Sequence, residues 1–94
     1  MKYSVLIADL EQLAAQLGLK VCYEKGDFEG GFCVLKEERM LVINRKLLDA
    51  RRASVLARAL WEYGLENVFV KPSLRAYIED EAVRRRGTKR VKFI

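Results

Sequence analysis

The sequence predicts a small α+β domain in which three helices pack on one side of a three-stranded antiparallel sheet. Apolar residues make up 51% of the 94 residues, enough for one hydrophobic core, so residues 1–94 are expected to form a single domain. Helical spacing of apolar residues marks the beginning and the second half of the chain, and short apolar runs mark the part between them. The predicted order of elements is α-β-β-β-α-α.

The first helix is predicted over residues 3–17. Its apolar residues recur three and four positions apart, which places them on one side of a helix. These residues are Tyr3, Leu6, Ile7, Leu10, Leu13, Ala14 and Leu17. Gly18 follows as a stop signal, because glycine adopts the backbone conformation that ends many helices.

Three strands are predicted next. Residues 20–24 form the first, at an edge of the sheet. Residues 32–35 and 40–43 form a hairpin closed by the charged turn 36–39. Their apolar runs are continuous, so the hairpin should be covered on both faces or lie in the middle of the sheet. The pair Gly30-Gly31 indicates a bulge or a close backbone approach.

Two helices are predicted to follow. The second begins at Asp49 or the residue before it and ends at Gly64, and the third begins at Pro72 and exposes the acidic residues 79–81. The residues that repeat at helical spacing along one side of the second helix are Leu48, Arg52, Val55, Leu56, Ala59, Leu60 and Tyr63. Those of the third are Leu74, Tyr77 and Ile78. Residues 88–94 are either an added edge strand or a disordered tail.

The formal net charge of +5 is concentrated at the C-terminal end. Residues 84–94 carry six basic side chains and no acidic one: Arg84, Arg85, Arg86, Lys89, Arg90 and Lys92. A second basic cluster surrounds the start of the second helix and comprises Arg45, Lys46, Arg51 and Arg52. Such clusters bind phosphate backbones, which makes nucleic acid one candidate partner. A solubilising tail is the competing interpretation, since Phe93 is the only aromatic residue in this segment.

Composition narrows the class of protein. No apolar run approaches the length of a membrane span, and Asp9 and Glu11 stand where a signal peptide would be uncharged, which predicts a cytoplasmic protein without membrane partners. Cys22 and Cys33 lack the C-x-x-C spacing and are expected to be buried free thiols, with a cross-strand disulfide as the alternative. Abundant Glu, Lys and Arg beside only two Asn and two Gln are typical of proteins from hot environments.

The middle of the chain resembles a known family. The strand Leu41-Val42-Ile43-Asn44 is followed by a basic turn, and the helix then contains Arg51-Arg52 and Leu56-Ala57-Arg58-Ala59-Leu60. This order is similar to the ImmA/IrrE family of zincin-like metallopeptidases, whose helix continues as L-A-H-E-L-G-H. The similarity covers about 25 of the 94 residues.

The resemblance fails at the catalytic positions. In H-E-x-x-H the two histidines bind zinc and the glutamate activates the metal-bound water. The corresponding residues here are Arg58, Ala59 and Glu62, and the whole chain has no histidine. The resemblance therefore implies a degenerate scaffold with no metal, no other cofactor and no peptidase activity. Arg58 is expected to form an ion pair with Glu62, one helical turn away.

Two functions remain as hypotheses. The first is a non-catalytic adaptor or regulatory domain that binds another protein, or a second copy of itself, through Arg58, Trp61 and Glu62. Trp61 lies beside the apolar side of its helix, where it either covers a neighbouring helix or anchors a partner. The second hypothesis is a nucleic-acid-binding domain that acts through its basic C-terminal segment.

Overall fold

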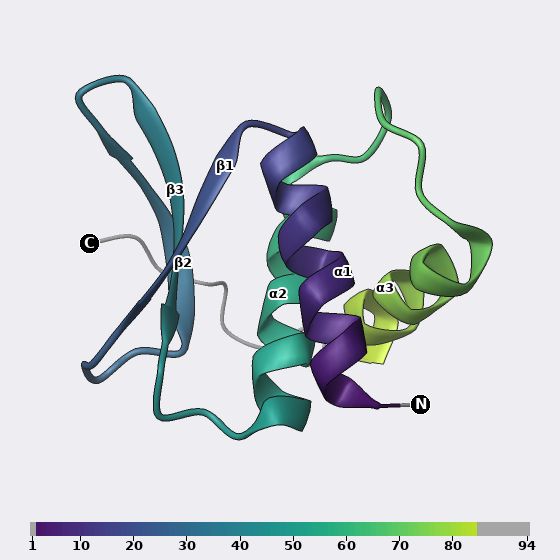
Figure 1. Cartoon of the computed structure of the whole chain (residues 1–94), viewed down its shortest axis with the longest axis horizontal. Coiled ribbons are helices and arrows are strands. Elements are labelled where there is room, and N and C mark those ends of the chain that lie inside the picture. Colours follow the sequence, from purple (N-terminus) through teal and green to yellow (C-terminus); the bar gives the residue numbers. More distant parts are fainter. Residues whose placement is uncertain (1, 85–94) are drawn as a thin grey trace.

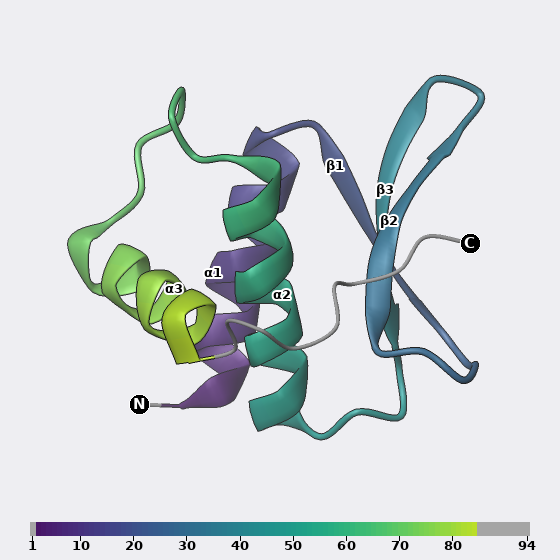
Figure 2. The same ribbon diagram turned by 180° about the vertical axis from the view of Figure 1, so that it is seen from behind.

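The computed structural model describes residues 2–84, and the elements appear in the predicted order (Figure 1). The helices are α1 (Tyr3–Gln16), α2 (Asp49–Tyr63) and α3 (Pro72–Arg84). The strands are β1 (Leu19–Glu24), β2 (Gly30–Leu35) and β3 (Glu38–Asn44). The helices lie together on one side of the sheet, which confirms the α+β prediction (Figures 1 and 2).

The sheet is mixed, so the prediction of an antiparallel sheet was wrong. Its strand order is β1-β3-β2, with β2 antiparallel to β3 and β1 parallel to β3. Successive strands do reverse direction along the chain, but β3 inserts between β1 and β2 and therefore runs parallel to β1. Asn44, at the end of β3, fixes the loop between β1 and β2. Its side-chain amide donates hydrogen bonds to the carbonyls of Gly26 and Phe28 at 2.9 and 2.7 Å.

The two faces of β3 differ in burial. Leu41 and Ile43 face the helices and are fully buried, whereas Met40 and Val42 face the other way and are half-buried. The continuous apolar run of this strand thus fits the central position in the sheet, one of the two predicted alternatives. The turn of the hairpin is shorter than predicted, because Lys36 and Glu37 alone form it, both with positive φ.

Gly30 is the close backbone approach predicted for the glycine pair. A Cβ atom added there would lie 2.9 Å from the carbonyl oxygen of Val42 and 2.9 Å from Cγ1 of Val55. The missing side chain lets the start of β2 pack directly against α2.

Helix α2 is the centre of the molecule. It packs against α1, α3 and the sheet, and every residue from Ala53 to Leu60 is buried (Figures 1 and 2). The one-sided apolar stripe predicted for it is therefore too narrow. Leu48 is also misplaced by that prediction, since it precedes the helix and is 81% exposed.

The cysteines are free and half-buried, less covered than predicted. Cys22 pairs with Val42 and Cys33 with Met40, on opposite edges of β3. Strands two positions apart in a sheet are separated by about 10 Å, which exceeds the reach of a disulfide bond. This strand order therefore excludes the alternative of a disulfide between them.

Candidate functional site

A groove forms where the β2–β3 hairpin meets the end of α2. We call it the hairpin groove, and its volume is about 420 Å³. Its lining comes from all three strands and from α2: Leu19, Phe32, Cys33, Val34, Arg39, Met40, Glu62 and Tyr63. The sequence predicted only Glu62 among these residues as part of a binding surface. The groove depends on where β3 inserts, which apolar periodicity does not specify.

Aromatic rings form one wall of the hairpin groove. The rings of Phe32 and Tyr63 lie 5.8 Å apart, in the range of favourable aromatic pairs. The guanidinium of Arg39 donates a hydrogen bond of 2.5 Å to the hydroxyl of Tyr63, which fixes a positive charge at the rim. Val34 adds an apolar surface and is 71% exposed. The groove therefore offers apolar contacts beside one cation and the carboxylate of Glu62.

Trp61 precedes Glu62 in the last turn of α2 and is 43% exposed. Part of its ring is thus accessible for contact with a partner. Of the three residues predicted to form a partner surface, Glu62 lines the hairpin groove and Trp61 lies next to it in the helix.

Arg58, the third residue, is only 7% exposed. Its Nη1 lies 3.7 Å from Oε1 of Glu29, in the loop before β2, and Arg51 pairs with the other oxygen of the same carboxylate. The expected ion pair of Arg58 with Glu62 was therefore wrong. The loop brings Glu29 over the middle of α2, a tertiary contact that helical spacing does not reveal. Arg58 holds the fold together and is inaccessible to a partner.

A buried hydrogen bond joins α2 to α3. The hydroxyl of Ser54 donates to Oε1 of Glu81 at 2.7 Å, and both side chains are buried. The prediction that residues 79–81 all face solvent is therefore wrong for Glu81. Ser54 and Arg58 lie one turn apart on α2, so polar contacts fix this side of the helix both to the sheet loop and to α3.

Tyr23 of β1 connects the sheet to α1 and α2. Its hydroxyl donates to the carboxylate of Glu11, and the guanidinium of Arg52 lies 4.9 Å from the centre of its ring. Burial of the phenol, together with the hydrogen bond to Glu11, raises the pKa of Tyr23 well above its usual value. The phenol therefore stays neutral and keeps its hydrogen bond over a wide pH range.

The second basic cluster is largely engaged in the fold. Arg51 pairs with Glu29, and Arg52 contacts Tyr23 and donates to the carbonyls of Arg45 and Leu47. Arg45 and Lys46 are exposed. Among the predicted cations of the C-terminal segment, Arg84 lies 3.8 Å from Glu81. The remaining ones, Arg85, Arg86, Lys89, Arg90 and Lys92, lie outside the described residues.

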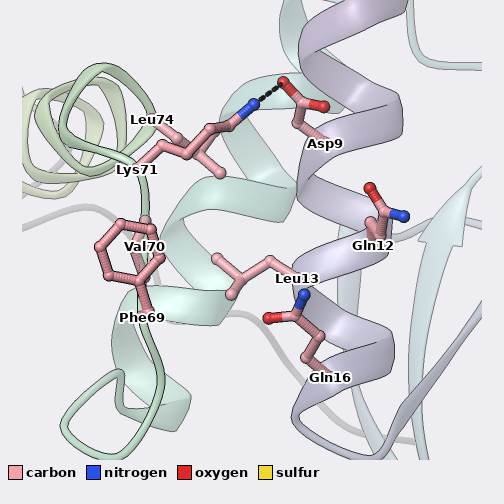
Figure 3. A pocket seen from close by; sticks show the side chains of 8 residues that line it. All are labelled: Asp9, Gln12, Leu13, Gln16, Phe69, Val70, Lys71 and Leu74. Atoms are coloured by element: carbon pink, nitrogen blue, oxygen red, sulfur yellow. Dashed lines mark hydrogen bonds and ion pairs between the residues drawn. The ribbon is translucent and has the colours of Figure 1, made fainter.

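A second cleft separates α1 from the connection between α2 and α3 and has a volume of about 270 Å³. Gln12, Leu13 and Gln16 line one side, and Phe69, Val70 and Lys71 line the other (Figure 3). Nζ of Lys71 lies 3.3 Å from Oδ2 of Asp9 and bridges the two sides (Figure 3). The ring of Phe69 is 79% exposed at the edge of this cleft.

Within residues 2–84, no group of three or more cysteine or acidic side chains is arranged to hold a metal ion. None of the helices in this range is long and apolar enough to cross a membrane. Comparison of the chain with models of protein families, with curated proteins and with solved structures gives no match.

Proposed function

We propose that this chain is a non-catalytic protein-binding domain whose partner occupies the hairpin groove. The observation that carries the proposal is the composition of the groove: an exposed valine and an aromatic pair beside one fixed cation and one carboxylate. Binding surfaces for proteins are commonly enriched in aromatic residues and arginine.

The groove fits an extended protein segment better than a rigid globular surface. Its volume accommodates one or two side chains, and the polar groups sit beside the apolar wall instead of surrounding it. A bulky apolar side chain would pack against Phe32, Val34 and Tyr63. A carboxylate of the partner would meet Arg39, and a basic group would meet Glu62. Trp61 is 43% exposed in the last turn of α2 and offers a further apolar surface outside the lining of the groove.

The proposal includes descent from the zincin-like scaffold. What supports it is the order of strand, basic turn and helix from Leu41 to Tyr63, in which the position of the first histidine is occupied by Arg58. That side chain is buried against Glu29, so the helix face that would carry a metal is used for packing. We expect the purified protein to contain no stoichiometric zinc. Tightly bound zinc, or cleavage of peptides that a chelator abolishes, would contradict this part of the proposal.

Selection of random peptides displayed on phage tests the binding function. The native chain should enrich peptides that share a bulky apolar residue. Val34→Glu places a charge on the wall of the groove and should weaken the enriched peptides by about tenfold or more. Val83→Glu is the matched control, because Val83 is 62% exposed on α3, away from the groove lining.

Both variants should keep the circular dichroism spectrum and the unfolding midpoint of the native chain, since both positions are exposed. The proposal fails if no peptide is enriched. It also fails if the enriched peptides bind Val34→Glu as tightly as they bind Val83→Glu.

A further inference from the structure

Strand β1 forms an open edge of the sheet, because among residues 2–84 its only paired neighbour is β3 (Figure 1). The amide of Arg45, just beyond β3, donates to the carbonyl of Glu24 at 3.0 Å, so the backbone groups of Glu24 point toward β3. Successive residues of a strand point their backbone groups to alternate sides. Those of Val21 and Tyr23 therefore point away from β3, and no backbone hydrogen bond within the described part of the chain reaches them.

The charges along β1 are arranged to attract a copy of the same strand. An open edge is a template for another strand, and many proteins prevent such pairing with charged side chains that have no counterpart. Lys20 and Glu24 are both exposed, carry opposite charges and lie two residues to either side of Cys22. Two β1 strands that run antiparallel about Cys22 therefore place Lys20 of each copy opposite Glu24 of the other, and opposite charges across a strand pair are stabilising.

The direction of the backbone groups allows this register. In an antiparallel pair, hydrogen bonds join residues whose backbone groups both point toward the partner. Val21 of each copy then lies opposite Tyr23 of the other and exchanges both backbone bonds with it, and a β-branched residue beside an aromatic one is a favourable pair. A slip of two residues loses the charge pairs, since Lys20 then faces Cys22 or Gly26. A slip of four residues brings like charges together.

We propose that a second copy of this chain pairs with β1, strand against antiparallel strand, and joins the two three-stranded sheets into one continuous sheet. The edge is complementary to itself, as a two-fold symmetric interface requires. The net charge of +5 does not oppose the contact at its centre, because residues 2–84 hold 13 basic and 13 acidic side chains and the excess lies in residues 85–94.

The dimer is expected to be weak and reversible, since one pair of short strands buries less than a standard interface of roughly 1,600 Å². None of the charged or hydrogen-bonding residues of this contact lines the hairpin groove. The self-association proposed here and the binding of a partner in the hairpin groove can therefore fail independently.

Cys22 provides a probe of the register, because the proposed pairing places it opposite its own copy. It would lie between two hydrogen-bonded pairs, where Cα atoms across an antiparallel pair are about 4.5 Å apart, a separation that a disulfide can span. Cys33 lies in β2, on the other side of β3, so the pairing does not bring it near its own copy.

Sedimentation velocity of the full chain at about 0.15 M salt, over increasing concentration, tests the inference. The average mass should rise from that of one chain, 10.9 kDa, toward twice that value. Lys20→Glu places like charges opposite each other at both ends of the contact and should lower the association constant by about tenfold. Glu24→Lys should do the same. The double variant Lys20→Glu with Glu24→Lys restores opposite charges at both positions and should associate like the native chain.

Lys46→Glu is the matched control, because Lys46 is exposed, lies outside β1 and undergoes the same change of charge as Lys20→Glu. It should associate like the native chain, and all variants should keep the native circular dichroism spectrum. Diamide oxidises a pair of thiols to a disulfide and takes up their electrons and protons as it becomes a hydrazine. Treatment of the associated chain should give a covalent dimer that persists in Cys33→Ser and is lost in Cys22→Ser.

A chain that stays monomeric at the highest concentration overturns the inference. So does a dimer that the single charge variants do not weaken, or one that the double variant fails to restore. A covalent dimer that depends on Cys33 would contradict the register. A dimer that is weakened by Trp61→Ala but not by Lys20→Glu would assign self-association to the end of α2.

Discussion

Arg51 and Arg58 bind the same carboxylate of Glu29 but in different surroundings. The side chain of Arg51 is 40% exposed, whereas that of Arg58 is 8% exposed and lies within the core of α2. An exposed ion pair contributes little to stability, because water screens the charges. A buried arginine contributes through the packing of its aliphatic stem as well as through its charge. The two residues therefore differ in importance despite their common partner.

Arg58→Ala should lower the free energy of unfolding by about 2 to 4 kcal/mol, since it removes a buried side chain and its ion pair. Arg51→Ala should cost about 1 kcal/mol or less. Glu62→Ala should have no measurable effect on stability, because the carboxylate that pairs with Arg58 is Glu29. Urea denaturation of the three variants provides the measurement. Equal losses for Arg51→Ala and Arg58→Ala would contradict the difference in burial.

Tyr23 makes the free energy of unfolding depend on pH in the alkaline range. Burial and the bond to Glu11 raise the pKa of Tyr23 in the folded protein above the value of about 10 for an unfolded chain. Above that pH the unfolded state releases a proton that the folded state retains, so the unfolded state is favoured and stability falls as pH rises.

Tyr23→Phe should be less stable than the native chain at neutral pH by about 1 kcal/mol, the usual contribution of one hydrogen bond. The difference should shrink as the pH rises above about 10, because only the native chain has this phenol to ionise. Urea denaturation at a series of pH values measures it. A difference that stays constant to high pH would show that the pKa of Tyr23 is not raised.

At the scale of elements, the start of β2 depends on a residue without a side chain. Gly30→Ala should destabilise the protein by about 1 to 3 kcal/mol, because the new methyl group meets the backbone of β3 and the side chain of Val55 in α2. Ala50→Gly, at an exposed helix position, serves as a comparison and should cost about 1 kcal/mol or less. The measurement is thermal unfolding followed by circular dichroism. A Gly30→Ala chain as stable as the native one would mean that β2 can move away from α2.

The order of the elements was predictable because each leaves a local pattern. Apolar residues at helical spacing identified α1, and the glycine pair identified the close approach at Gly30. The pairing of strands was not predictable, since the period of a strand fixes which side chains face the core but not which edge it joins. The continuous apolar run of β3 allowed a central position in the sheet, but it did not specify which strands would lie on either side.

The unknown pairing of the strands also limited the prediction of the candidate site. Glu62 and Trp61 were predicted from their position on α2, and both are exposed. The rest of the hairpin groove comes from strands that the mixed sheet brings to the end of α2. Arg58 was misassigned because its partner, Glu29, lies 29 residues earlier in the chain, in a loop without a periodic pattern.

At the scale of the whole molecule, residues 2–84 and residues 85–94 differ in net charge. Residues 2–84 carry 13 basic and 13 acidic side chains and are neutral overall, while residues 85–94 add five basic ones. The second basic cluster contributes little, because Arg51 and Arg52 are engaged within the fold. Nucleic acid therefore remains a hypothesis that depends on residues 85–94.

Generic duplex DNA should bind the full chain only at low salt, with affinity falling by about a hundredfold or more between roughly 50 and 200 mM. Deleting residues 85–94 should abolish this binding, whereas the double variant Arg45→Ala and Lys46→Ala should reduce it only slightly. Fluorescence anisotropy of labelled DNA measures the affinities. Absence of binding at low salt removes nucleic acid as a partner, and binding that survives the deletion would assign it to the neutral part of the molecule.

The position of β3 also bears on how the chain folds during synthesis. The first strand to leave the ribosome, β1, has its pairing partner not in the next strand but in the third, which ends at Asn44. The hairpin of β2 and β3 joins neighbouring segments and can form by itself. Strand β1, in contrast, has no strand to pair with until β3 has emerged. The chain from Leu19 to Asn44 must therefore emerge before β1 can join the sheet.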